Sequence, residues 1–307
     1  MKKPLVTLII TTYNQDKLLE ETIKSLKKKT NYKNYKIILV DDGSKKKIGE
    51  IFKKRFRDID VIINKVNKGF SGANNIGMKY SLQKYFPDYF LLLNDDMEII
   101  DKKSLDKLTI IGESNNKIGI LGGQILYTDR TLQNIGNNIE GWKINRVTKF
   151  KKNSVFNVDS VMGCCFLIKK SVVERIGFLD EIYNPYLLEE TDYCLRAKKE
   201  GFFVKCVSSV KIIHKKGKTI DSLNSSKKMF IRFKNDLIFS MRHLTWKNAL
   251  FRIFVYLPIV AIFKKRKDTD DLKFKNFILR KDFMINLGLL FLAHIYNMKN
   301  VGKIYGN

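Results

Sequence analysis

Two adjacent carboxylates follow an apolar run in this sequence. Leu91-Leu92-Leu93-Asn94 leads directly into Asp95 and Asp96. Two carboxylates at the end of a buried strand repel each other unless a cation or the hydroxyl groups of a ligand lie between them. Oxygen ligands of this kind suit a divalent metal ion. The pattern therefore indicates a cation site, with a solvated turn as the simpler alternative.

A second acidic group lies on a segment with helical spacing. Asp192 and Arg196 are four residues apart and can form a structural ion pair, whereas Glu190 has no obvious partner at helical spacing. A helix start favours the ionised form of Glu190, and the neighbouring carboxylates oppose it. Glu190 is therefore a candidate proton acceptor, with a solvated acidic turn as the alternative.

His214 is one of only three histidines and directly follows the apolar residues 210–213. If the end of this segment faces Asp95 and Asp96, the imidazole joins the carboxylates at one site. An imidazole beside carboxylates suits Mn²⁺ better than Mg²⁺. A packed structural histidine is the alternative.

Alternating strands and helices would bring these residues together. The apolar and β-branched runs 5–12, 35–40, 61–63 and 89–93 are predicted strands, and 18–26, 48–56 and 71–85 are predicted helices. This alternation predicts an α/β fold with a mostly parallel sheet covered on both faces. Ligands bind such sheets outside the carboxyl ends of the strands.

The second half of the chain is mixed. Predicted strands cover 118–127, 160–168, 202–207 and 210–214, and predicted helices cover 170–176 and 185–199, the latter opened by Asn184-Pro185. Beyond about Thr219 the pattern is helical, with apolar blocks at 249–263 and 285–296. We expect an α/β domain over residues 1–220 and a helical C-terminal extension over residues 221–307.

The predicted loops at the strand ends contain residues suited to a nucleotide. Asp42 can accept hydrogen bonds from a nucleobase edge while Tyr13 stacks nearby and Thr11 adds a polar contact; a helix-capping turn is the alternative for Asp41-Asp42. Gly69 and Gly72 precede a helix and allow close approach of the backbone to a nucleotide. The loop is not GxGxxG, so a nicotinamide cofactor is not expected.

Composition narrows the classes of protein. A net charge of +27 over 307 residues favours an anionic partner such as nucleic acid, phosphates or the inner face of a membrane, and a lysine-rich composition bias explains it equally well. The basic residues are spread along the chain without a nucleic-acid-binding motif. The four cysteines form no CxxC pair and indicate reduced core residues of a cytosolic protein. We find neither a signal peptide nor a run long enough to span a membrane.

Taken in order, these segments resemble the family 2 glycosyltransferases of the GT-A fold, in particular the subgroup that includes rhamnosyltransferases. The resemblance covers residues 4 to about 245. It rests on Thr11-Thr12-Tyr13-Asn14, Val40-Asp41-Asp42-Gly43-Ser44, residues 67–77, Leu92-Leu93-Asn94-Asp95-Asp96, residues 163–168, Gly177-Phe178-Leu179-Asp180-Glu181, Glu189-Glu190-Thr191-Asp192 with Leu195-Arg196, and His214.

The resemblance implies a Rossmann-like sheet, a nucleotide-sugar donor and a role for each matching residue. Asp96 ends the DxD-like motif, whose first Asp is replaced by Asn94, and would bind Mn²⁺ or Mg²⁺, with His214 as a further metal ligand or a diphosphate contact. Glu190 stands where the family's base stands, which leaves Glu190 or Asp192 as the base. The donor site would comprise Thr11, Tyr13, Asp42, Asn67, Gly69, Gly72, Asn75 and Asp95, with Asp95 at the ribose.

The implied reaction is inverting transfer of a sugar from a UDP-, dTDP- or GDP-linked donor to a hydroxyl of a glycan or lipid-linked glycan, with no nucleic acid involved. Two alternatives stay open: a sugar-phosphate nucleotidyltransferase and a basic nucleic-acid-binding protein. The first normally has a glycine-rich basic loop after its first strand, where this chain has Thr11-Thr12-Tyr13-Asn14.

The C-terminal extension raises the question of membrane contact. The block 249–263 is about 22 Å long as a helix, shorter than the roughly 30 Å hydrocarbon core, and Arg252 interrupts it. With Lys264-Lys265-Arg266-Lys267 behind it, the block could lie on an anionic leaflet or pack on the catalytic domain. We therefore expect a cytoplasmic protein, either free or peripheral on the inner face of the cell membrane.

Overall fold

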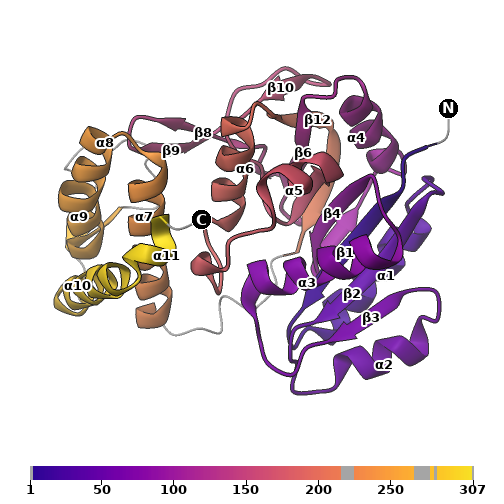
Figure 1. The fold of residues 1–307 in the computed structure, drawn as a ribbon, viewed down its shortest axis with the longest axis horizontal. Helices are drawn as coiled ribbons and strands as arrows, with labels where there is room; N and C mark the ends of the chain where they lie inside the picture. Colours follow the sequence, from indigo (N-terminus) through magenta and orange to yellow (C-terminus); the bar gives the residue numbers. More distant parts are fainter. Residues whose placement is uncertain (1–2, 216–224, 266–276, 280–281, 306–307) are drawn as a thin grey trace. The chain divides into compact units, whose positions relative to one another are not determined.

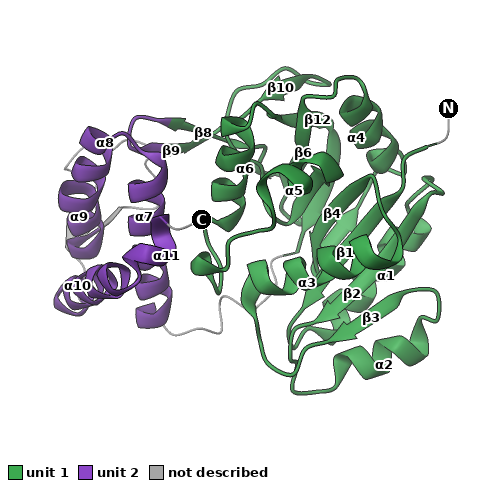
Figure 2. Ribbon diagram, viewed as in Figure 1, with its two compact units in different colours: residues 1–139, 144–219 green, residues 140–143, 220–307 purple. Residues whose placement is uncertain are grey.

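The computed structural model describes residues 3–215, 225–265, 277–279 and 282–305 (Figure 1). The chain divides into two compact units (Figure 2). The first comprises Met1–Ile139 and Ile144–Thr219, and the second comprises Glu140–Lys143 and Ile220–Asn307. The first unit holds the sheet and every residue predicted to do chemistry.

A twisted sheet forms the centre of the first unit, with the strand order β10-β12-β6-β11-β4-β1-β2-β3. Within this order β11 and β10 run opposite to the other six strands, so the predicted mostly parallel sheet is confirmed. The strands are β1 (Val6–Thr12), β2 (Tyr35–Asp41), β3 (Asp60–Ile63), β4 (Tyr89–Asn94), β6 (Ile118–Leu126), β10 (Val155–Asn157), β11 (Cys165–Lys169) and β12 (Phe203–His214).

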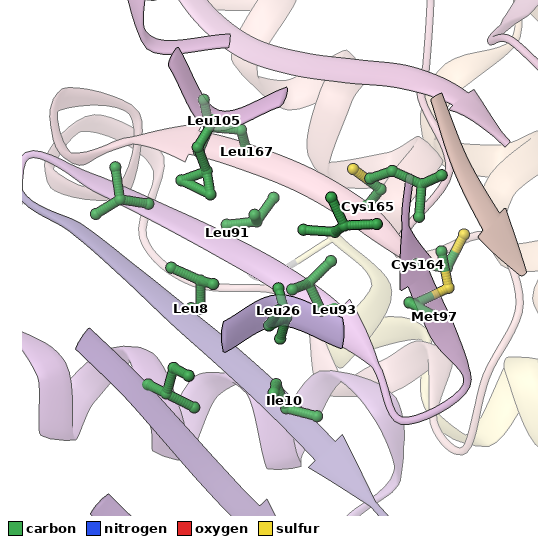
Figure 3. Packing of buried hydrophobic residues seen from close by; sticks show 14 of the residues in the cluster. Leu8, Ile10, Leu26, Leu91, Leu93, Met97, Leu105, Cys164, Cys165 and Leu167 are labelled. Carbon is green, nitrogen blue, oxygen red and sulfur yellow. The ribbon is translucent and has the colours of Figure 1, made fainter. Parts of the chain in front are cut away.

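Helices cover both faces of this sheet because its strands are apolar on both sides. In β1, Leu8 and Ile10 point into one hydrophobic cluster and Ile9 into the other. The first cluster, shown in Figure 3, is closed by α1 (Asp16–Lys28), α2 (Ile48–Arg55) and α4 (Ser104–Glu113). The second is closed by α3 (Gly69–Lys84), α5 (Lys170–Ile176) and α6 (Glu189–Lys199).

The register of the parallel strands aligns their carboxyl ends. Thr11 lies opposite Val40 of β2 on one side and Asn94 of β4 on the other. The loops that follow β1, β2 and β4 therefore leave the sheet at the same edge, as predicted.

A short strand, β5 (Met97–Ile99), pairs antiparallel with the end of β12. Its register puts His214 opposite Met97, next to Asp96. Neither β5 nor the continuity of β12 was predicted: the two expected strands 202–207 and 210–214 are one strand with a register shift between Val207 and Lys211. Another short strand, β7 (Leu132–Asn134), pairs with β6, and β8 (Asn137–Glu140) pairs with β9 (Lys143–Arg146).

Two predicted boundaries are wrong for local reasons. The helix expected from Pro185 begins at Glu189, after the 3-10 turn η1 (Glu181–Tyr183), because Leu187 and Leu188 adopt φ values of 90° and 74°. L-residues rarely adopt this conformation, and it redirects the chain into α6. The strand expected from Ser160 begins at Cys165, since Ser160 forms an isolated bridge with Asn137 and a turn intervenes.

The second unit is mainly helical. Among the described residues, no helix is both long and apolar enough to cross a bilayer. Its basic run extends beyond the described part, since residues 266 and 267 lie outside it. The elements are α7 (Ser225–His243), α8 (Trp246–Phe251), the π-helical turn η2 (Arg252–Tyr256), α9 (Leu257–Ile262), β13 (Phe263–Lys265), β14 (Phe277–Leu279), α10 (Phe283–Lys299) and α11 (Val301–Tyr305).

Candidate active site

Asp41, the last residue of β2, and Asp42, which follows it, bind different loops. The Asp41 carboxylate accepts backbone N–H groups of Ser44 at 3.0 Å and Gly49 at 2.7 Å, which fixes the start of α2. The Asp42 carboxylate accepts the N–H groups of Lys68 at 2.9 Å and Gly69 at 3.0 Å, together with the side chain of Asn64. Burial raises the pKa of Asp42, and these hydrogen bonds partly offset that rise. Asp42 thus fixes the loop that precedes α3.

That loop approaches a second loop closely enough to require glycine. Gly69 has a φ of +70°, and a Cβ atom there would lie 2.9 Å from both Asn184 Oδ1 and Pro185 Cα. The next residue, Phe70, donates its N–H to the Pro185 carbonyl at 2.9 Å. Close packing against the chain that leads into α6 therefore already requires glycine at this position.

Asn75, predicted to contact the nucleotide, is engaged inside the protein. Its side-chain amide donates to the Leu179 carbonyl at 2.9 Å and to Glu181 at 3.1 Å, and its oxygen accepts the Leu179 N–H at 3.0 Å. It therefore holds α3 against residues 179–181. Gly72 faces the same segment, since a Cβ there would lie 3.4 Å from Glu181. Asn67 is exposed and accepts the Gly69 N–H at 3.1 Å.

Asp95 joins the loop after β4 to the loop after β1. The Thr12 hydroxyl donates to its carboxylate at 2.6 Å, and the Tyr13 N–H also bonds to it. On the other side, the Asp95 carbonyl accepts from the Thr22 hydroxyl at 2.8 Å. Burial raises the pKa of Asp95 to about 7, and the neighbouring Asp96 charge adds to the rise. Thr11 and Tyr13 are partly buried beside this bond.

Asp96 and His214 meet as predicted. His214 Nε2 lies 3.2 Å from Asp96 Oδ2, with both side chains largely buried, and the next residue, Lys215, donates its N–H to the Asp96 carbonyl at 2.9 Å. The other ring nitrogen of His214 lies 3.1 Å from Gln133 Oε1. A hydrogen bond from Nδ1 to that oxygen leaves Nε2 facing the Asp96 carboxylate, where the ring nitrogen can hold either a proton or a metal ion.

Glu190 lies in the first turn of α6, over the short segment that leads into β11. A Cβ on Gly163 would lie 3.6 Å from Glu190 Cβ and 2.9 Å from the Phe70 ring. Burial raises the pKa of Glu190 to about 7, opposed by a hydrogen bond from its own backbone. Burial also raises the pKa of the Cys164 thiol, and the charges of Asp96 and Glu190 add to this rise. Both carboxylates therefore lie near the same buried thiol.

Asp192 is fully buried and paired within the protein. Its carboxylate accepts Arg196 Nε at 2.8 Å and the Tyr183 hydroxyl at 3.2 Å. Arg196 donates further to the carbonyls of Ile176 at 2.9 Å and Phe178 at 3.1 Å. The predicted structural ion pair between Asp192 and Arg196 is confirmed, and it ties α6 to the chain after α5.

One edge of the sheet thus gathers the Thr12–Asp95 bond, the Asp96–His214 pair and the Asp42-anchored loop. Within the described part of the chain, no group of three or more His, Cys, Asp or Glu residues could hold a metal ion by itself. A cation here would need most of its ligands from a bound molecule.

Two residues that contact the predicted site residues were not themselves predicted. Gln133 lies on the three-residue strand β7, and a lone glutamine beside an exposed leucine gives no signal in the sequence. Thr12 stands beside the predicted Thr11 in the same strand, where side chains alternate between faces. This alternation could have identified Thr12, because it lies two residues beyond Ile10 and therefore points to the same face of the sheet as Leu8 and Ile10, the face that α1 covers.

Comparison with known sequences decides the family. Residues 7–177, more than half of the chain, match the sequence profile described as Glycosyl transferase family 2. The chain belongs to glycosyl transferase family 2. The GT-A fold expected from the sequence is also confirmed.

Among the relatives of this family 2 chain is the low-salt glycan biosynthesis hexosyltransferase Agl10 of Haloferax volcanii, 31% identical over 188 residues that cover 60% of each chain. The dTDP-rhamnosyl transferase RfbF of Shigella flexneri is 27% identical over 216 residues, 67% of each chain. The chain therefore spans about 60% of the length of Agl10.

The fold is also similar to that of GalNAc-T7, solved with UDP, GalNAc and Mn²⁺. The two structures superpose with a TM-score of 0.65 at 15% sequence identity, over 98% of this chain and 58% of the other. At this identity the likeness concerns the fold.

Proposed function

We propose that this family 2 enzyme is an inverting, metal-dependent glycosyltransferase. It would move a sugar from a nucleoside-diphosphate donor to a hydroxyl of a glycan or lipid-linked glycan. The observation that carries this proposal is the meeting, at one sheet edge, of a carboxylate–imidazole pair from β4 and β12 with the desolvated Glu190 close by.

Asp96 and His214 fit a divalent cation. Neighbouring ligands on an octahedral ion with bonds of about 2.1 Å lie about 3 Å apart, close to the 3.2 Å between Asp96 Oδ2 and His214 Nε2. Two protein ligands leave the other positions to the donor diphosphate and water, as is usual for Mg²⁺ and Mn²⁺. Bound there, Mn²⁺ or Mg²⁺ would neutralise charge on the departing nucleoside diphosphate. The imidazole ligand favours Mn²⁺.

The donor would lie against the loops after β1, β2 and β3. Thr11 and Tyr13 would contact the base, with Asp42 holding the loop of Asn67, Gly69 and Gly72 in place. Asp95 would bind the ribose hydroxyls, since a buried carboxylate that already accepts from Thr12 has further lone pairs to offer. UDP, dTDP and GDP donors all stay candidates: RfbF is named a dTDP-rhamnosyl transferase, GalNAc-T7 was solved with UDP, and another fold neighbour, a mannosyltransferase of Pyrobaculum calidifontis, was solved with GDP-Man.

Glu190 would take the proton from the acceptor hydroxyl. Its pKa of about 7 leaves it about half ionised at neutral pH and makes it a stronger base than an ordinary glutamate. Asp192 is held by Arg196 and Tyr183, which supports Glu190 as the base. Proton removal makes the acceptor oxygen a better nucleophile for direct displacement at the anomeric carbon.

The acceptor class rests on the relatives, and the compartment rests on the cysteines. Agl10 is named a hexosyltransferase of glycan biosynthesis, which supports a hexose donor and a glycan acceptor here. Four buried free thiols support a reducing, cytoplasmic compartment.

A donor screen tests the proposed function. UDP-, dTDP- and GDP-hexoses would each be incubated with the protein and a glycan acceptor mixture, with Mn²⁺ or with EDTA. We expect one nucleotide class to be consumed, only with the metal present, and NMR should show the product with inverted anomeric configuration. Retention of configuration, or equal consumption in EDTA, would contradict the proposal. Glu50→Gln, an exposed carboxylate of α2, is the control variant.

A further inference from the structure

The C-terminal unit has an unusual distribution of polarity. Of the 22 large hydrophobic residues exposed in the described part of the chain, 13 lie between Trp246 and Tyr305. The inside of the same unit holds an apolar core that includes Phe233, Leu257 and Leu290, and several polar side chains are buried beside it. The buried ones are Lys234, Asn235, Asp236, Ser240, Arg252, Asn286 and Asn297. A helix that faces water normally carries polar side chains on its outer face, so the unusual feature of this unit is the number of large apolar side chains that it exposes.

Helix α10 shows this exposure of apolar side chains most clearly. Its buried stripe contains two asparagines: Asn286 donates to the Ala261 carbonyl at 3.3 Å, and Asn297 donates to the Lys234 carbonyl at 3.0 Å. The opposite stripe is apolar and exposed, and comprises Met284, Ile285, Phe291, Leu292 and Met298. The helix therefore satisfies its polar groups internally and presents hydrocarbon outward.

The segment α8–η2 repeats the pattern. Trp246, Leu250 and Phe254 recur every four residues on its exposed face. Arg252, expected from the sequence to interrupt this apolar block, points inward instead. It pairs with Asp236 and donates to the Trp142 carbonyl, both within the same unit. Its charge is thus removed from the exposed face.

The two apolar stripes meet. The Phe254 ring of η2 stacks on the His294 ring of α10, with centroids 6.3 Å apart and planes 18° apart. Large apolar side chains that gather on neighbouring exposed helix faces are typical of an interaction surface. A partner is needed to cover it.

Charge identifies the partner. Lysine and arginine far outnumber aspartate and glutamate in residues 220–307, and four consecutive basic residues, Lys264-Lys265-Arg266-Lys267, follow α9 in the sequence. A second copy of so basic a unit would be repelled, whereas anionic lipid attracts it. None of the helices in the described part of this unit is both long and apolar enough to span a bilayer, so they would lie in its interface.

We propose that the exposed face of α8, η2 and α10 inserts into the interface of an anionic lipid bilayer. Phe254 and Phe291 are its central anchors, and Trp246 lies at the start of α8. This inference stands on the second unit alone and does not depend on the sugar-transfer reaction.

Vesicle binding by the full-length protein tests the inference. The wild type should cosediment with phosphatidylglycerol-containing vesicles, and only weakly with pure phosphatidylcholine. The variant Phe254→Ser/Phe291→Ser removes side chains that are 67% and 65% exposed, so folding should persist while the partition coefficient falls at least tenfold. Phe86→Ser is the matched control, since Phe86 is 72% exposed in the first unit.

Three outcomes overturn the inference. The first is wild-type protein that ignores anionic vesicles, and the second is equal binding by the wild type and the double variant. The third is a concentration-dependent dimer that forms without vesicle binding and that the double variant abolishes. This result would assign the face to a second copy of the chain.

In a Trp142→Phe background Trp246 is the only tryptophan, and its emission should shift to the blue on binding anionic vesicles.

Discussion

Asp96 and Asp192 are both buried carboxylates beside a basic side chain, but the two pairs are built differently. Asp192 pairs with Arg196 one helical turn away, and the guanidinium is held further by two backbone carbonyls. Asp96 meets His214, which the chain supplies more than a hundred residues later through the β5–β12 pairing. Arginine keeps its charge at all accessible pH values, whereas a histidine can offer a lone pair. The first pair is suited to a fixed structure and the second to a ligand.

A third carboxylate extends the comparison. Glu190 has its pKa raised by burial rather than lowered by a cation, as suits a base. We expect Glu190→Gln to lower turnover by about 10²- to 10⁴-fold while donor and metal affinities stay within a factor of two or three. The measurement is steady-state transfer combined with calorimetric titration of nucleoside diphosphate, with Glu50→Gln as control. Turnover close to that of the wild type would remove Glu190 from the mechanism.

The same change should affect stability with the opposite sign. The pKa of Glu190 is about 7 in the folded protein against a reference value of 4.5, so the folded state retains the proton more strongly and loses stability as pH rises from about 4.5 to 7. Glu190→Gln removes this loss, so above pH 7 the variant should be more stable than the wild type in urea unfolding.

Asp192→Asn should be mainly a stability variant. Loss of the charge leaves Arg196 without its carboxylate, and breaking a buried pair in this way costs about 3 to 5 kcal/mol of unfolding free energy. Urea unfolding measures this cost. The control is Asp58→Asn, whose exposed pair with Lys27 should contribute less than about 1 kcal/mol. An unchanged unfolding midpoint with lost turnover would instead make Asp192 the base.

Gln133→Leu should affect the Asp96–His214 pair. Without the acceptor at Nδ1, the His214 ring loses its fixed tautomer and orientation, and the loss of such a partner typically lowers metal affinity by about 10- to 100-fold. Titration of Mn²⁺ in the presence of nucleoside diphosphate measures the effect. Gln83→Leu, on the exposed side of α3, is the control. Equal affinities would show that Gln133 does not orient the histidine.

The pH profile gives the smallest effect. Because Glu190 must be ionised to accept a proton, kcat/KM should fall about tenfold per pH unit below about pH 7. The residual kcat/KM of Glu190→Gln should lack this fall at acidic pH, the acidic limb of the profile. A limb retained in that variant would belong to another group.

The sequence predicted the site where strand order alone decides it. The carboxyl ends of parallel strands share one edge, so the ends of β1, β2 and β4 had to meet there. The close approach of His214 to Asp96 depends in addition on the β5–β12 pairing, which was not predicted. Gln133 could not be predicted, because a three-residue strand has no periodicity to recognise.

Polar residues at loops were the hardest to interpret. A buried asparagine needs partners, but composition does not distinguish a ligand from a neighbouring loop, and Asn75 bonds to the Leu179 backbone. The start of α6 depends on two leucines with positive φ, which no propensity favours. The inward turn of Arg252 depends on Asp236, which lies sixteen residues away on another helix.

The most direct test of the account is Mn²⁺ binding measured by electron paramagnetic resonance, with a saturating nucleoside diphosphate, in the wild type, Asp96→Ala and His214→Ala. We expect one tightly bound ion in the wild type and a loss of affinity of at least tenfold in each of these two variants, with Asp192→Asn unchanged at a temperature where it is folded. Wild-type affinity in both Asp96→Ala and His214→Ala would contradict the assignment of this pair as the metal site.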